Sequence, residues 1–382
     1  MWIVPLGSVL TAQGAGHLVP WAFSLGPLAA MVSPLLVGAL ADRRFQAQHL
    51  LSLFCLVSAA FLFLAFHGLG QGWGGTMFLA LLAAHQLCFV PTWSLVSSII
   101  LTHAPNPPRN FPLLRVWATL AWIVSGLAVS FCLRADTTTR AGLVASVLLA
   151  TAGLYALSLP STPPTAPSLA ASGWRQLLGW DALDAFPKGN LRVFLVAHGL
   201  LSVPLAAFFP YAPQFLRVLG HGKTTALMSS GQVAETLSMI MLGWFLLRWP
   251  LKRILALGLG FATLRYACLA AGALHPWTPL VVTGLTMHGL IYTFFFVTAQ
   301  VFVEKEVDRK WRARVQALLT TVSSGLGSLV GVLAAGLWFS LTVASSPADP
   351  VRWSWFWGGL ALVAALVAGY FLTFYHGRNE KK

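Results

Sequence analysis

One acidic residue, Glu235, lies inside a long apolar stretch of the chain, in the segment Ser229–Leu246 (SSGQVAETLSMIMLGWFL). A charged side chain at the centre of a bilayer costs about 3 kcal/mol or more, so it usually faces a water-filled cavity and has a partner or a task. Arg115 is one of two basic residues that lie within other apolar stretches. We expect Arg115 and Glu235 to form a buried ion pair, whose chemistry is either structural or concerned with holding and releasing a proton.

The composition indicates an integral membrane protein. Hydrophobic residues make up 57% of the 382-residue chain and charged residues only 9%, with a mean hydropathy of +0.75; a soluble globular protein is far less apolar. A hydrocarbon core of about 30 Å is crossed by roughly 20 helical residues. We therefore expect an all-α membrane protein with eleven full spans, which start near His17, Gln48, Gly74, Phe111, Arg140, Arg192, Lys223, Leu251, Pro276, Ala313 and Val351.

The basic residues are distributed unequally between the two sides of this predicted bundle. Alternating the loops places seventeen of the 24 Lys and Arg residues on the side that holds the C-terminus and five on the other side. Cytoplasmic loops carry such an excess, so we expect a cytoplasmic C-terminus. The net charge of +14 is then a feature of membrane topology, and a nucleic acid is not expected as a partner; the lipid bilayer is.

Two helical bundles are expected on either side of a central cytoplasmic linker. Residues 161–190 are rich in Pro, Ser and Ala and then become amphipathic, as a segment on a membrane surface would. The N-terminal bundle covers residues 1–160 and the C-terminal bundle residues 191–382. Because only half a span, Met1–Ala12, precedes the first full one, we expect a truncated first helix. A six-plus-six arrangement is typical of the major facilitator fold, in which substrate binds between the halves.

A loop motif favours the same architecture. The segment Gly38–Arg44 (GALADRR) resembles the G-x-L-a-D-R-x-G-R loop of major facilitator transporters, although Phe45 stands where the second glycine is expected. A small Gly38 allows close helix approach, and Asp42 with Arg43 at a helix end could bind charged groups and the end of a neighbouring helix. We expect a conformational latch here; an ordinary solvated loop is the alternative.

A more specific resemblance lies further along the chain. The segments Phe111–Thr119, Ser230–Leu237 and Val301–Val307 are similar to the corresponding stretches of the bacterial nucleoside:proton symporters, the nucleoside permease family. The similarity runs from about Trp2 to Tyr375. The resemblance implies a multi-pass protein of the bacterial inner membrane that moves nucleosides by proton symport, through alternating access of its two halves.

The same resemblance implies four residues of a nucleoside site. Arg115 and Thr119 match an arginine and a threonine on the family's fifth helix, and Gln232 and Glu235 match a glutamine and a glutamate on its eighth. Their chemistry is suitable, because each pair has helical i, i+4 or i, i+3 spacing and shares one helix face. Amide, carboxylate and hydroxyl groups can bind ribose hydroxyls and a base edge.

Other positions depart from the family pattern. Ala206 and Phe209 replace a glutamine and an asparagine on the seventh helix, and Thr293 replaces a membrane-embedded aspartate on the tenth. With that aspartate gone, Glu235 is the remaining acid for proton coupling. We expect it to carry the proton, and a purely structural ion pair with Arg115 is the alternative.

Nearby residues suggest a modified pocket. His288 and Tyr292 have i, i+4 spacing and are expected to face the same cavity as Thr293, while Trp122 lies one turn beyond Thr119. His288 could relay a proton or could be a hydrogen-bonded packing histidine. Tyr292, Trp122 and Phe209 could stack on a planar ring, or could make ordinary lipid or core contacts.

The sequence therefore predicts a secondary active transporter for nucleosides, working as a monomer with protons as the coupling ion. The first alternative is a major facilitator transporter for another small polar solute, such as a sugar or glycoside, moved by facilitated diffusion or symport. A non-transporting membrane sensor is the second. No span carries a nucleophile and base pair or a metal-ligand set, so neither an enzyme nor a cofactor or metal site is expected.

Overall fold

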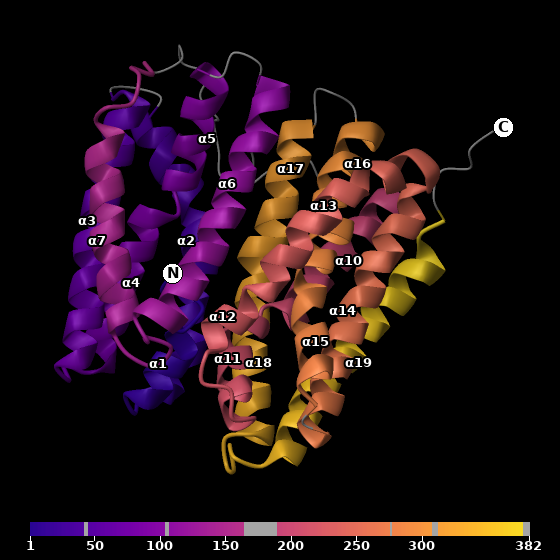
Figure 1. Ribbon diagram of the computed structural model, residues 1–382. Helices are drawn as coiled ribbons and strands as arrows, with labels where there is room; N and C mark the ends of the chain where they lie inside the picture. Colours follow the sequence, from indigo (N-terminus) through magenta and orange to yellow (C-terminus); the bar gives the residue numbers. More distant parts are fainter. Residues whose placement is uncertain (42–44, 104–106, 164–188, 276, 308–311, 377–382) are drawn as a thin grey trace. The chain divides into compact units, whose positions relative to one another are not determined.

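The computed structural model describes residues 1–41, 45–103, 107–163, 189–275, 277–307 and 312–376. Every regular element among these residues is a helix, and none is a strand (Figure 1). The predicted all-α class is thus confirmed. The chain divides into two compact units, Met1–Leu178 and Gly179–Lys382, so the division falls within the predicted linker. Most of that linker lies outside the described residues.

The N-terminal unit consists of seven α-helices and two shorter helical elements of other types among its described residues. They are α1 (Leu6–Ala12), the 3₁₀ helix η1 (Gly16–Leu18), α2 (Val19–Ala41), α3 (Ala47–Gly70), α4 (Gly75–Phe89), α5 (Thr92–His103), α6 (Pro107–Leu127), the π-helix η2 (Ala128–Cys132) and α7 (Arg140–Ala156).

The C-terminal unit contains longer helical runs, two of which are interrupted by π-helical segments. Its elements are α10 (Asn190–Leu205), α11 (Phe208–Val218), α12 (Thr224–Met228), α13 (Ser230–Arg248), α14 (Leu251–Leu274), α15 (Thr278–Ile291), the π-helix η3 (Tyr292–Val297), α16 (Thr298–Glu306), α17 (Arg312–Thr320), the π-helix η4 (Thr321–Gly327), α18 (Ser328–Thr342) and α19 (Pro350–Phe374). Within this unit α14 packs against α15 and α19, and α13 packs against α15.

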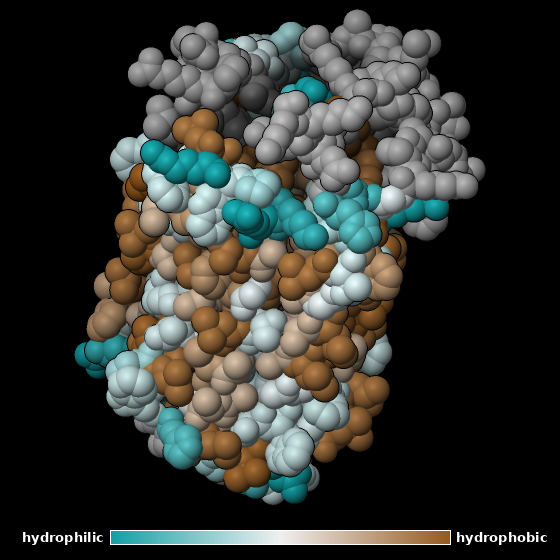
Figure 2. Space-filling view, turned by 90° about the vertical axis from the view of Figure 1, so that its right-hand side faces the viewer, coloured by the Kyte–Doolittle hydropathy of each residue, from teal (hydrophilic) through white to brown (hydrophobic). Residues whose placement is uncertain are grey.

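The helices agree with the predicted spans. Each of the eleven predicted starts lies within four residues of the start of a helix or helical run. Seven runs in the described part of the chain are long and apolar enough to cross a membrane, and three shorter apolar helices accompany them. In the face shown in Figure 2, hydrophilic residues gather mostly toward the two ends, with brown to pale residues between them. This is the surface that a membrane-spanning protein presents to lipid.

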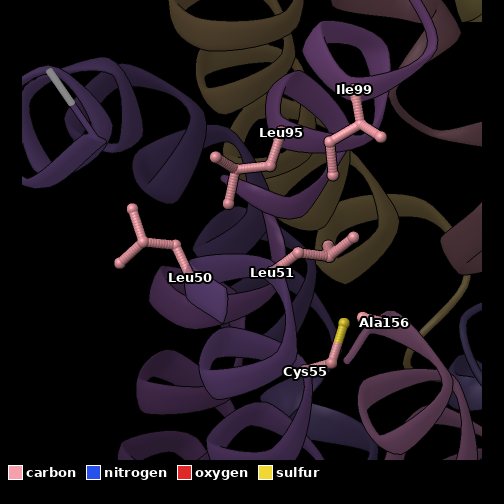
Figure 3. Packing of buried hydrophobic residues seen from close by; sticks show 6 residues of the cluster. All are labelled: Leu50, Leu51, Cys55, Leu95, Ile99 and Ala156. Atoms are coloured by element: carbon pink, nitrogen blue, oxygen red, sulfur yellow. The ribbon is translucent and has the colours of Figure 1, made fainter. Parts of the chain in front are cut away.

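Small and apolar side chains hold the N-terminal unit together. Figure 3 shows one buried cluster that joins three helices, α3, α5 and α7: Leu50, Leu51, Cys55, Leu95, Ile99 and Ala156. Cys55 serves there as a small apolar residue. A second contact lies where Gly142 of α7 faces the ring of Phe66 on α3, because a side chain on Gly142 would collide with that ring.

A break interrupts the first long helical run of the C-terminal unit. Helix α10 ends at Leu205 and α11 begins at Phe208, with Pro204 in the last turn of α10. The hydroxyl of Tyr266 on α14 donates a hydrogen bond to the carbonyl oxygen of Pro204, at 2.6 Å. Irregular backbone at membrane depth must be satisfied by protein groups, so Tyr266 stabilises the break that sets the direction of α11.

Candidate functional site

The site residues predicted in the N-terminal unit lie on one helix. Arg115, Thr119 and Trp122 are all on α6, at spacings that place them on a single helix face. Thr119 and Trp122 are half-buried. The side chain of Arg115 lies outside the described part of the structure, so its ion pair with Glu235 stays a prediction.

The predicted latch is described only in part. Gly38 lies near the C-terminal end of α2. Asp42 and Arg43 lie outside the described residues, and the role of this motif therefore also stays a prediction.

Gln232 and Glu235 lie on α13, which approaches α15 unusually closely. A Cβ atom built on Gly289 of α15 would lie 2.7 Å from the Cα of Glu235, and nearer still to the Glu235 backbone nitrogen and the Gly231 carbonyl oxygen. The two backbones therefore touch at Gly289, as helices in membranes do where small residues meet. This contact sets the position of Glu235 along the helix axis relative to His288, the residue next to Gly289.

Gln232 lies in the same buried turn of α13. Its side chain is 6% exposed, and its Oε1 atom is buried without a hydrogen-bond partner among the residues that the structure describes. Glu235, one turn later, is half-buried. A buried acceptor without a partner needs a specific explanation, and a bound group that donates to it is one.

His288 is enclosed by aromatic rings from the start of α11. Its imidazole stacks on Phe208 with ring centroids 5.1 Å apart, and meets Phe209 edge-on at 5.3 Å. Gly231 of α13 leaves room for the ring, because a Cβ there would lie 3.2 Å from the Cβ of His288. The structure thus brings together His288, Phe209 and the turn of α13 that carries Gln232.

Arg265 lies in this region and was not among the predicted site residues. It lies on α14, is 0% exposed, and holds its guanidinium carbon 3.4 Å from the ring centroid of Phe208. Its Nη1 atom is 3.5 Å from Nδ1 of His288. Its Nε and Nη2 atoms have no hydrogen-bond partner in the described part of the chain. The signal was available, since an ionisable residue within a span is by default a functional candidate.

Thr293 lies in the π-helical segment η3 and faces α13. It is 0% exposed, and its hydroxyl accepts a 2.8 Å hydrogen bond from Ser238. Thr298 donates to the backbone carbonyl of Thr293 at 3.1 Å, which satisfies an oxygen that the wider π turn reorients. π-Helical turns often occur at functional sites. Tyr292 beside it is half-buried and stacks on Phe296, with centroids 6.2 Å apart.

These features define a class of protein. Apolar helical runs, polar side chains within them and close glycine contacts are the properties of a multi-pass membrane protein. A solved structure of the nucleoside transporter NupG superimposes with a TM-score of 0.88, at 24% identity, over 98% of this chain and 95% of that one. The fold is accordingly of the major facilitator type, as predicted.

Sequence comparison then gives the family. The family model described as "Nucleoside H+ symporter" matches residues 1–380, and the chain belongs to this family. YegT of Escherichia coli (strain K12) is 33% identical over 395 residues, which cover all of this chain and 91% of YegT. The nucleoside permease NupG of the same organism is 27% identical over 352 residues, covering 88% of this chain and 83% of NupG.

The family match confirms the predicted resemblance and, with it, the predicted class of function, nucleoside transport coupled to protons. The homologues are transporters rather than enzymes, and the chain is a multi-pass protein of the inner membrane. The roles of the individual site residues stay predictions.

Proposed function

We propose that this protein moves nucleosides with protons by alternating access of its two units, and that Arg115, Thr119, Gln232 and Glu235 bind the nucleoside. The observation that carries the proposal is the turn of α13 with Gln232 and Glu235, held against α15 by the backbone contact at Gly289. Buried polar groups in an otherwise apolar span are retained where a substrate or an ion uses them.

The chemistry of the described half-site suits a nucleoside. Gln232 offers an amide and Glu235 a carboxylate, both suited to ribose hydroxyls and to the edge of a base. Phe209 and His288 are adjacent aromatic rings of the C-terminal unit. We also assign Trp122, Tyr292 and Thr293 to substrate binding. Aromatic groups of this kind stack on planar bases.

We assign the proton to Glu235. A carboxylate in a span is costly when charged, and protonation removes that cost, so coupling its protonation to substrate binding would link the two movements. His288 is the second candidate for a role in proton coupling. We further propose that the protein works as a monomer and that its C-terminus is cytoplasmic. Gly38, Asp42 and Arg43 would form the conformational latch.

Uridine uptake into cells that lack their own nucleoside permeases tests this proposal. We expect the wild type to accumulate uridine and a protonophore to abolish the accumulation. Glu235→Gln is expected to lose accumulation while it still exchanges internal for external uridine, because the neutral amide mimics the protonated acid.

A matched control is Glu304→Gln. Glu304 pairs with Arg312 at the end of α16, and its side chain is 65% exposed, so accumulation should be unchanged. Accumulation that persists in Glu235→Gln would remove Glu235 as the carrier. Uptake of sugars or glycosides in place of uridine would favour the other transporter hypothesis, and tight binding to proteoliposomes without accumulation would favour the sensor.

A further inference from the structure

A buried cation beside a histidine distinguishes the C-terminal half of the site. Arg265 is fully buried, and among the described residues the one polar neighbour of its guanidinium is Nδ1 of His288, 3.5 Å from Nη1. The guanidinium is also stacked on Phe208 and lies 5.0 Å from the ring of Tyr266. Cation–π contacts partly compensate the loss of water around a charge. They do not explain why a guanidinium, and not an apolar side chain, is placed against the imidazole.

The contact between Arg265 and His288 restricts the hydrogen positions on the imidazole. A guanidinium can only donate hydrogen bonds, so Nδ1 of His288 must act as the acceptor. In a neutral imidazole with Nδ1 unprotonated, the hydrogen is on Nε2. An imidazolium would instead put two positive charges within hydrogen-bond distance in a buried place. Arg265 therefore favours one form of His288, the neutral tautomer with a donor at Nε2.

The imidazole of His288 turns its Nδ1 atom toward Arg265 of α14 and its Cδ2 atom toward α13. A Cβ atom on Gly231 would lie 3.5 Å from Cδ2 of His288, the carbon bonded to Nε2. Gly231 precedes Gln232, whose Oε1 is buried without a partner in the described part of the chain. His288 itself is half-buried, in contrast to Arg265 and Phe208 behind it. Nε2, which is bonded to Cδ2, is therefore on the part of the ring away from Arg265, and the neighbouring turn of α13 is the one assigned to the nucleoside.

Several other titratable groups lie on the elements packed around His288. They are Lys252, Arg253, Arg265, Tyr266 and Cys268 on α14, Glu235 and Arg248 on α13, Tyr211 and Arg217 on α11, and Tyr292 on the adjoining η3. The residues of α11 that touch the ring, Phe208 and Phe209, do not titrate. Of these groups, Arg265 is the one with a polar atom within hydrogen-bond distance of His288 in the described contacts.

We propose that Arg265 is a positioning residue that fixes His288 as a neutral Nε2–H donor, and that this donor selects nucleosides whose base presents a carbonyl oxygen. The inference rests on the proposed function and deepens it by naming a substrate class, the keto bases. Uridine at C4 and inosine at C6 carry a carbonyl oxygen where cytidine and adenosine carry an amino group, which is itself a donor, and this is the base edge that the proposal places against Nε2. His288 is then a specificity residue, and the proton carrier is Glu235.

Exchange in proteoliposomes with equal pH on both faces tests the inference, because the ratio of two nucleosides does not depend on the driving force. The wild type is expected to prefer uridine over cytidine, and inosine over adenosine, by about tenfold, the value of one neutral hydrogen bond. His288→Gln retains an N–H near the position of Nε2 and should keep this ratio. His288→Asn places its amide near Nδ1 instead and should bring the ratio close to one.

A pH series separates positioning by Arg265 from a merely structural role. The wild-type ratio should be constant from about pH 5.5 to 7.5, since His288 stays neutral with its donor at Nε2. In Arg265→Met either tautomer is available at high pH, so the ratio should fall. Burial still disfavours the imidazolium in this variant, so only below about pH 6.5, the ordinary value for imidazole, should the donor at Nε2 return with the second proton and the ratio recover. Arg265→Lys retains a donor-only cation and should restore the constant ratio.

Three outcomes would overturn the inference. Equal exchange of keto and amino nucleosides by the wild type removes the selectivity and leaves proton-coupled nucleoside transport intact. If His288→Asn keeps the wild-type ratio, His288 is not the source of the selectivity. This variant leaves the buried arginine unchanged, so it tests the role of His288 even when Arg265→Met fails to fold. Exchange of none of the four nucleosides by the wild type overturns the proposed function, and this inference with it.

Discussion

Gly289→Ala is the smallest change that should separate α13 from α15. The added methyl group would lie 2.7 Å from the Cα of Glu235 and closer still to backbone atoms of Glu235 and Gly231. Backbone cannot rotate away as a side chain can, so one helix must move by about 1 Å. Forced shifts of this kind cost about 1 to 3 kcal/mol. Because 1.4 kcal/mol corresponds to tenfold, we expect uridine uptake to fall by about tenfold or more.

The assay compares uridine uptake per molecule of protein in the membrane, together with the melting temperature in detergent. Gly243→Ala is the matched control, because Gly243 lies on the same α13 and an added Cβ would meet nothing within 4 Å. This control should transport normally and be slightly stabilised by the better helix propensity of alanine. Wild-type uptake by Gly289→Ala would refute the close backbone contact and the placement of Glu235 derived from it.

Two smaller changes test the hydrogen bonds that support the site. Ser238→Ala removes the donor to Thr293 and should lower the free energy of unfolding by about 1 kcal/mol, seen as a lower melting temperature; an unchanged value would mean that this bond contributes nothing. Tyr266→Phe leaves the Pro204 carbonyl oxygen without its 2.6 Å donor. It should destabilise the protein by a similar amount and slow uridine uptake. Tyr370→Phe removes a hydroxyl with no described hydrogen bond and should do neither. Equal effects of the two tyrosine changes would contradict the role of Tyr266 at the helix break.

The course of the chain through the membrane could be predicted from sequence because it depends on local composition. Apolar runs of about 20 residues must be helical in lipid, and the predicted starts at Arg140 and Leu251 coincide with the starts of α7 and α14. The π-helical segment at Tyr292–Val297 has no comparable signal. Within it, Thr293 hydrogen-bonds to Ser238 of another helix, a contact that local composition does not reveal.

The site could be predicted only where single residues are costly in lipid. Glu235 was identified in this way, and Arg265 carries the same signal. The neighbours of Arg265 could not be predicted from the sequence. Phe208, Arg265 and His288 come from three different helices, and their packing depends on glycine contacts and on the break after Pro204. The partner of Glu235 depends on how the two units meet, so the pair with Arg115 stays a prediction.

Proton movement during uridine transport tests the central claim most directly. In proteoliposomes that contain a pH-sensitive dye, adding uridine outside should acidify the interior when the wild type is present. Glu235→Gln should abolish this acidification and still exchange labelled uridine at a comparable rate. Uridine-driven acidification of equal size in the wild type and in Glu235→Gln would contradict the assignment of the proton to Glu235.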